Sequence, residues 1–322
     1  MLNIAIAAEF ELAEKIAASL ENSSLPVKNL VVVEIEPFSE EQGIRFKNKG
    51  VAQISPQDMN WSDYHYFFFA GNVDDVPCLV TATQAGCMGI DIKGVCANLS
   101  EIPLVIPTIN ETALCELRQR NIVSLPNPQI TQCCLAISPL LAEIEVTQLM
   151  VTSLLPAAYQ SVESVGRLAS QTAQLLNGIP LNEEEQRLAF DVFPQQENYV
   201  MQFSRIFPEI QNVTFHSIQV PVFYGMGQKI TALCLNDINV DNLTTCWQQN
   251  GIIEYHQRVI TPVTNGERET NEKITKLHIS SVENLDNGVS FWAVADEQRF
   301  TQASMAVKLA EAIYHQDYQH DQ

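Results

Sequence analysis

The 322-residue chain is strongly acidic, with 38 Asp and Glu against 18 Lys and Arg residues and a formal net charge of −20 at pH 7. This charge repels phosphate backbones and the basic residues are scattered, so we expect no nucleic-acid partner. Apolar residues make up 46% of the chain, which permits full-sized cores, and the length predicts about two domains.

Eight cysteines are spread through apolar segments without the Cys/His spacing of a zinc site. We therefore expect buried, reduced thiols and no metal site. The chain begins directly with an apolar strand, so no signal peptide is expected, and no run reaches the ~18 apolar residues of a membrane helix. These features predict a soluble, cytoplasmic protein without a membrane partner.

Short apolar runs alternate with helical patterns over the first 125 residues. This alternation predicts a parallel sheet with right-handed crossovers, a Rossmann-type domain. The expected strands are 2–7, 30–35, 66–70, 88–90, 104–107 and 122–123, and the expected helices are 9–21, 74–85 and 112–120.

Longer, partly alternating strands follow and predict an α+β domain over residues 126–301. The strands expected here are 145–153, 213–223, 229–235, 276–282 and 289–294, with helices at 130–142, 157–176 and 199–206. A last helix at about 302–322 is expected to pack back onto the first domain, which comprises residues 1–125. The predicted fold class is thus α/β, with a parallel-sheet domain and a second α+β domain.

A Pro-Asn-Pro stretch follows the strand at 122–123. Asn127 suits a helix N-cap, and Pro128 suits the first helical position, where its missing N–H costs nothing. The stretch resembles the nucleophile elbow of the aspartate-semialdehyde dehydrogenase family. Pro126, Asn127 and Gln132 of this chain match residues of that elbow. Pro128 stands at the position of that family's catalytic cysteine.

Further stretches resemble the same family in the same order along the chain. They are Pro103 to Asn110, Val220 to Gly225 and Phe291 to Arg299. Two others, Leu175 to Pro180 and Ala306 to Glu311, resemble the Usg group of bacterial paralogues of the dehydrogenase. The resemblance implies the family's two-domain fold and pairing through the second domain.

The family chemistry that the resemblance implies needs a thiolate nucleophile, a histidine base, an arginine for the substrate carboxylate and a glutamine beside the nucleophile. The matching positions are Pro128, Met226, Gln219 and Leu155, none of which keeps the required group. Cys133 and Cys134 are expected in the core and not as replacements. The looser matches for the substrate-binding Glu and Lys and for a phosphate-binding arginine are Gln202, Arg205 and Ala97, and His216 is expected to be a half-exposed strand histidine.

The family binds NADP, and the resemblance places its phosphate-loop glycines at Ala8, Glu11 and Glu14. Side chains there would occupy the space of the pyrophosphate, and the carboxylates would repel it. The family's C-terminal Asn and Gly positions are Glu297 and Thr301. After the second strand, where a basic residue would hold the 2′-phosphate, the charged residues are Glu34, Glu36, Glu40 and Glu41. An acidic residue there would suit the ribose of NAD, but without the glycines this signal is weak.

Three hypotheses follow. The leading one is a catalytically inert family member without bound NADP, which forms a homodimer or a heteromer with an active homologue and has a binding or regulatory role. The alternative is an NAD(P)-dependent oxidoreductase of the aspartate-semialdehyde dehydrogenase type, with residual or altered activity in amino-acid biosynthesis. The third is a sensor that binds a small molecule, such as an amino acid, in the inherited cleft.

Overall fold

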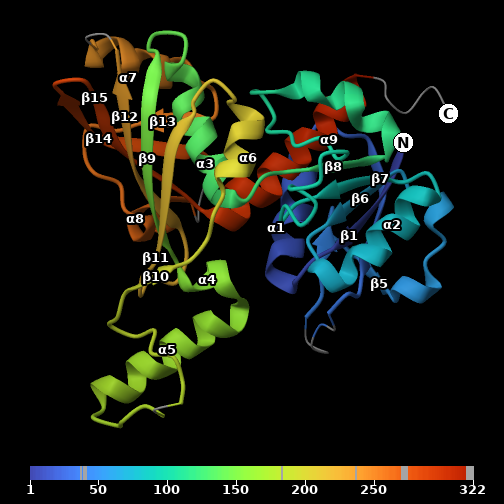
Figure 1. Cartoon of the computed structure of the whole chain (residues 1–322). Coiled ribbons are helices and arrows are strands. Elements are labelled where there is room, and N and C mark those ends of the chain that lie inside the picture. Colours follow the sequence, from blue (N-terminus) through green and yellow to red (C-terminus); the bar gives the residue numbers. More distant parts are fainter. Residues whose placement is uncertain (37, 39–41, 183, 236–237, 270–274, 317–322) are drawn as a thin grey trace. The chain divides into compact units, whose positions relative to one another are not determined.

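The computed structural model describes residues 1–36, 38, 42–182, 184–235, 238–269 and 275–316 (Figure 1). The chain divides into two compact units, one comprising Met1–Thr131 and Gln298–Gln322 and the other Gln132–Glu297. The division lies a few residues from the boundaries expected at 125/126 and 301/302. Residues 317–322, which the last predicted helix included, lie outside the described residues, as do Glu40 and Glu41.

The first unit is built on a six-stranded parallel sheet with the order β5-β2-β1-β6-β7-β8, as a Rossmann-type domain requires. Its central strands are apolar on both faces, because helices and loops cover both sides. Its strands are β1 (Leu2–Ala7), β2 (Val27–Val33), β5 (Ala52–Ile54), β6 (Tyr66–Phe69), β7 (Met88–Asp91) and β8 (Ile122–Ser124), with a small β3 (Arg45–Phe46) and β4 (Lys49–Gly50) pair apart from it.

Helices α1 (Phe10–Glu21), α2 (Val76–Gln84) and α9 (Met305–His315) complete the first unit. Although α9 is last in the chain, it packs against α1, as predicted. Glu311 of α9 accepts hydrogen bonds at 2.7 Å from the backbone N–H and the hydroxyl of Ser24, just after α1. The C-terminal helix therefore belongs to the first unit.

The second unit contains a seven-stranded mixed sheet with the order β10-β11-β9-β12-β15-β14-β13. The sheet explains the α+β pattern of the sequence, because β11 is parallel to β9 while β12, β15 and β14 are antiparallel neighbours. Its strands are β9 (Val146–Leu155), β10 (Phe193–Gln195), β11 (Asn212–Gln219), β12 (Met226–Cys234), β13 (Ile253–Tyr255), β14 (Leu277–Leu285) and β15 (Gly288–Ala295). Its helices are α3 (Pro128–Ile137), whose first turn is counted to the first unit, α4 (Ala157–Gln160), α5 (Val162–Leu176), α6 (Val200–Ile206), α7 (Val240–Gln249) and α8 (Pro262–Glu269).

Several sequence predictions need correction. Residues 104–107 are not a strand, and only Leu104 makes an isolated bridge, to Ser124. The helix at 112–120 is a 3₁₀ helix, Glu111–Gln119. The helix at 157–176 is divided at Ser161, whose extended backbone ends α4 and whose hydroxyl caps α5. The helices α7 and α8 and the strands β3, β4, β5, β10 and β13 were not predicted.

The turn after β7 and the end of β8 are joined through one buried carboxylate. Asp91 accepts hydrogen bonds from the backbone N–H groups of Gly94, Val95 and Cys96 at 2.7–3.2 Å and from the Ser124 hydroxyl at 2.7 Å. Burial raises the pKa of this carboxyl group, and the hydrogen bonds oppose that shift. Ser124 leads directly into the Pro-Asn-Pro stretch, so Asp91 fixes where that stretch begins.

Asp91→Asn should lower the free energy of unfolding by about 1–3 kcal/mol, because the new NH₂ group would face at least one backbone N–H and leave it unpaired. Urea unfolding of the full chain measures the change. Asp58→Asn, at an exposed position of the same unit, is the control and should unfold like the parent chain. Equal midpoints for all three proteins would contradict this role of Asp91.

Candidate functional site

The predicted elbow is confirmed as a strand-to-helix turn. The Asn127 side chain accepts a hydrogen bond of 2.9 Å from the backbone N–H of Gln129, and its carbonyl accepts from Ile130 and Thr131. Pro128 is the buried first residue of α3. Asn127 therefore caps the helix, and the position that matches the nucleophile carries no atom able to attack a carbonyl carbon.

The neighbouring thiols are placed as core residues. Cys133 and Cys134 are both 0% exposed on α3, and burial raises the pKa of each thiol far above its usual value. Because the thiolate is the nucleophilic form, both groups are unreactive at neutral pH. The expectation of free, buried thiols is confirmed for five cysteines, whereas Cys78 and Cys246 are half-buried and Cys115 is exposed, contrary to the expectation.

Three family-matched positions of the second unit lie side by side at one end of its sheet. Leu155 ends β9 and is in register with Gln219, which ends β11. On the other side of β9, Leu154 is in register with Gly227, which follows Met226 at the start of β12. Residues far apart in the sequence thus form one row across β11, β9 and β12, although each lacks the chemical group that the family position requires.

The row is buried and uncharged. Met226 and Leu155 are almost fully buried, and Gln219 is 2% exposed. The Gln219 amide donates to the carbonyl oxygens of Leu155 at 3.0 Å and Val220 at 3.4 Å, so it secures the backbone where an arginine would offer a cationic fork. Its Oε1 atom has no hydrogen-bond partner among the described residues, which is uncommon for a buried acceptor.

A second amide reaches the strands beside this row. The Nε2 atom of Gln132, on α3, donates to the carbonyl oxygens of Ala293 at 3.2 Å and Met226 at 3.5 Å. Its Oε1 atom also has no partner within the part of the chain that the structure describes. Glu297, after β15, accepts from the backbone N–H of Gly225 at 3.2 Å. Gln132 and Glu297 therefore hold the chain around Met226.

The loop between β1 and α1 has the acidic character that the sequence predicted. Ala8 is buried, and Glu9 precedes the first residue of α1. The Glu9 carboxylate forms an ion pair with Lys93 at 3.0 Å, and Glu11 lies 3.8 Å from Lys15, while Glu14 is exposed. A methyl group and two carboxylates at this helix N-terminus do not fit a pyrophosphate, which needs close backbone approach and no negative charge.

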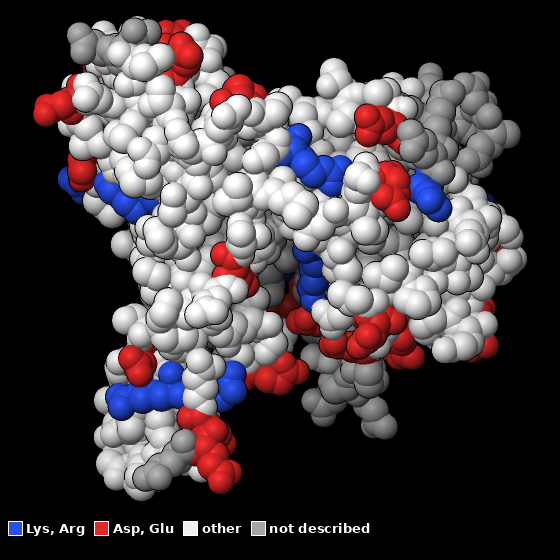
Figure 2. Space-filling model, viewed as in Figure 1, with Lys and Arg blue, Asp and Glu red and all other residues white. Residues whose placement is uncertain are grey.

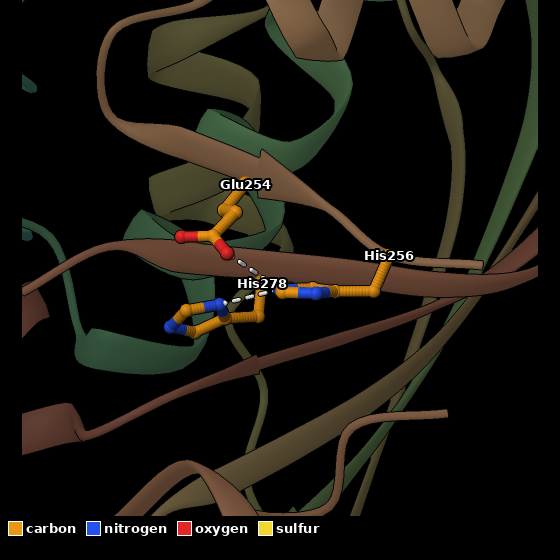
Figure 3. Close-up of side chains that lie close together, drawn as sticks. All are labelled: Glu254, His256 and His278. Carbon is orange, nitrogen blue, oxygen red and sulfur yellow. Dashed lines mark hydrogen bonds and ion pairs between the residues drawn. The ribbon is translucent and has the colours of Figure 1, made fainter. Parts of the chain in front are cut away.

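Other residues singled out in the sequence offer no further catalytic arrangement. Ala97 is buried and carries no charge, and Gln202 and Arg205 are buried and half-buried on α6. His216 is an exposed histidine on β11, as a strand histidine of this kind was expected to be. A cluster that the sequence reasoning missed, Glu254, His256 and His278, lies at the other edge of the same sheet (Figure 3). The sequence feature that could have revealed this cluster is the i, i+2 spacing of Glu254 and His256, which places both side chains on one face of a strand.

On the face shown in Figure 2, Lys and Arg side chains lie among Asp and Glu side chains, and no extended basic surface forms from the described residues. Among those residues, no helix is both long and apolar enough to cross a membrane.

The chain matches no family model. It is 54% identical over 318 residues to a USG-1 protein homolog of Haemophilus influenzae, with 98% of this chain and 99% of the relative covered. It is 29% identical to aspartate-semialdehyde dehydrogenase 2 of Vibrio cholerae, with 97% of each chain covered. The crystal structure of aspartate semialdehyde dehydrogenase II from Vibrio cholerae superposes with a TM-score of 0.89 at 28% identity and 99% coverage of both chains.

Thiol labelling tests the burial of the cysteines. In the native protein, Ellman's reagent should react fast with the exposed Cys115 and slowly with the half-buried Cys78 and Cys246. Burial raises the pKa of Cys78 to about 11, which slows its reaction. The five buried cysteines should react only after unfolding, because the reagent cannot reach them. Cys115→Ser should remove the fast phase, and Cys133→Ser should leave it unchanged. A fast phase that disappears in Cys133→Ser would contradict the assignment.

Proposed function

Because this chain belongs to the USG-1 family of aspartate-semialdehyde dehydrogenase-like proteins, we propose that it has lost the dehydrogenase reaction and has a binding or regulatory role. One observation carries the proposal: Pro128 occupies the nucleophile position, while the thiols next along the helix, Cys133 and Cys134, are buried and protonated. This arrangement therefore provides no thiolate that could attack an aldehyde.

The remaining parts of the constellation support the same conclusion. Met226 cannot accept or donate a proton in place of a histidine, and Gln219 offers a neutral amide in place of an arginine. Leu155 cannot hydrogen-bond in place of a glutamine. Loss of a single member of a catalytic constellation costs several orders of magnitude in rate, so the combined loss supports the absence of useful turnover.

We also propose that the protein does not bind NADP. The support is the first loop, where the buried Ala8 replaces a glycine and the carboxylates of Glu9 and Glu11 lie near the start of α1. A dinucleotide pyrophosphate would meet like charge there. Lys93 and Lys15 do not reverse this, since each already pairs with one of these carboxylates.

The proposed role includes self-association or a heteromer with an active homologue. Within the second unit, α5 and the chain that follows it expose several large apolar side chains: Leu176, Ile179, Phe190 and Val192. Large apolar side chains that are left exposed can form interaction surfaces in soluble proteins. We propose that this segment, seen with α5 in Figure 1, contributes to the pairing that the family resemblance implies.

A second candidate function rests on the unpartnered acceptors. The Oε1 atoms of Gln219 and Gln132 are buried without partners among the described residues, and a ligand with N–H donors would satisfy them. The protein would then be a sensor for a small molecule such as an amino acid. Stabilisation by one amino acid in a thermal-shift screen, abolished by Gln219→Leu, would favour this function over a purely protein-binding role.

Purified protein should reduce no NADP with aspartate semialdehyde and phosphate, and NADP should leave its melting temperature unchanged. The Vibrio cholerae aspartate-semialdehyde dehydrogenase 2, assayed in parallel, is the positive control. Pro128→Cys should remain inactive, because it restores a thiol without the base or the arginine. A clear rate in the parent chain that Cys133→Ser or His216→Ala abolishes would instead support an active oxidoreductase.

Sedimentation should show a dimer, and Leu176→Ser combined with Ile179→Ser should shift it toward monomer by removing exposed apolar contact area. Leu285→Ser, at an exposed position on β14, is the control and should leave the dimer intact. Co-expression with an active homologue followed by pull-down then tests the heteromer. Recovery of homomers alone would exclude the heteromer.

A further inference from the structure

The edge strand of the second unit's sheet brings one carboxylate and two imidazoles together. Glu254 lies on β13 directly opposite His278 on the parallel strand β14. His256 follows two residues after Glu254, and its backbone N–H donates to Ile279 at 2.8 Å, so the pairing with β14 continues past β13. Because side chains alternate along a strand, all three residues project to one face, as Figure 3 shows.

The distances between the polar atoms resemble those of a metal site. The Nε2 atom of His256 shares a hydrogen bond of 2.9 Å with Nδ1 of His278, which a bound metal ion would replace, and it lies 3.5 Å from Oε1 of Glu254. All three potential ligand atoms lie within 4.8 Å of one another. Bonds of about 2.0–2.2 Å to a tetrahedral Zn²⁺ separate neighbouring ligand atoms by about 3.3–3.5 Å. The His256 contacts thus need to move by only a few tenths of an ångström.

We propose that Glu254, His256 and His278 form a binding site for a divalent transition metal ion, with Zn²⁺ as the best match. The ligands are a carboxylate oxygen of Glu254, Nε2 of His256 and Nδ1 of His278. Two imidazoles and one carboxylate are a donor set that suits Zn²⁺ and leaves its fourth position for water.

The burial of the three ligands matches an open site of this kind. His278 is 2% exposed and forms the floor, the His256 side chain is 13% exposed, and Glu254 is 32% exposed at the rim. The water would enter from the side of Glu254.

Two cations compete with a metal for the carboxylate. Arg268 lies 3.3 Å from Oε1 of Glu254, and Lys276 lies 4.0 Å from Oε2. Both side chains are more than a third exposed, and surface ion pairs of this kind contribute only about 0–1 kcal/mol. A Zn²⁺ ion that gains the carboxylate and two imidazoles can displace them, so Arg268 weakens the site without blocking it.

Substitution of Arg268 therefore distinguishes two explanations of the cluster. If the cluster only neutralises Glu254, removal of Arg268 creates no metal affinity. If the cluster is a metal site, removal of the competing charge tightens it. The site rests on β13 and β14 alone and does not depend on whether the dehydrogenase reaction is lost.

The test is Zn²⁺ titration of the tag-free, full-length protein by isothermal calorimetry. The Cys115→Ser background removes the exposed thiol as a competing ligand. We expect one Zn²⁺ per chain, affinity at least tenfold weaker in His256→Gln and in Glu254→Gln, and affinity several-fold tighter in Arg268→Gln. Co²⁺ bound at the same site should give the visible absorption of a tetrahedral ion.

The control is His216→Gln, which removes an exposed histidine of the same unit and should leave Zn²⁺ affinity unchanged. His256→Gln and Glu254→Gln carry the test because the buried His278 is more sensitive to substitution, and circular dichroism checks that both variants are folded. Absence of stoichiometric binding would overturn the proposal. Binding that is equal in the parent, His256→Gln and Glu254→Gln proteins would overturn it as well.

Discussion

The buried carboxylate of Asp91 fixes the geometry on which the strand-to-helix turn depends. It gathers three consecutive N–H groups from the turn after β7 and the hydroxyl of Ser124 from the end of β8. The turn then lies against the chain that follows β8. Gly94, with φ of +72°, is so close that a Cβ atom there would be 3.0 Å from the carbonyl oxygen of Leu125. Unpaired, a buried carboxylate is costly, so the four hydrogen bonds and the local fold stabilise each other.

This constraint explains why the turn forms with Pro128 at the position that matches the family's nucleophile. Asn127 satisfies an N–H group at the start of α3, and Pro128 removes one that would otherwise need a partner. Both residues therefore stabilise the turn, and neither needs a reacting group. A catalytic elbow and a structural elbow share the same backbone requirements and differ only in the side chain at one position.

The sequence predicted the buried parallel strands of the first unit, because strands buried on both faces are continuous apolar runs, but it missed the mostly exposed edge strand β5. It failed where tertiary contacts decide: residues 104–107 are apolar but make only one bridge, and β13 is a short edge strand without a strong pattern. At the candidate site, the identities of Gln219 and Met226 predicted missing chemistry. Their alignment across three strands follows from register, which a single sequence does not contain.

The sheet of the second unit carries two separate groups of side chains. The buried, uncharged row lies on β11, β9 and β12, whereas the Glu254 and His278 pair lies on β13 and β14, with β15 between the two groups. In the row, the Gln219 side chain hydrogen-bonds to backbone carbonyl groups. At the edge of the sheet, the side chains of Glu254, His256 and His278 contact one another. The chemistry at one group therefore places no limit on the chemistry at the other, because the two groups share a scaffold but no ligand atom.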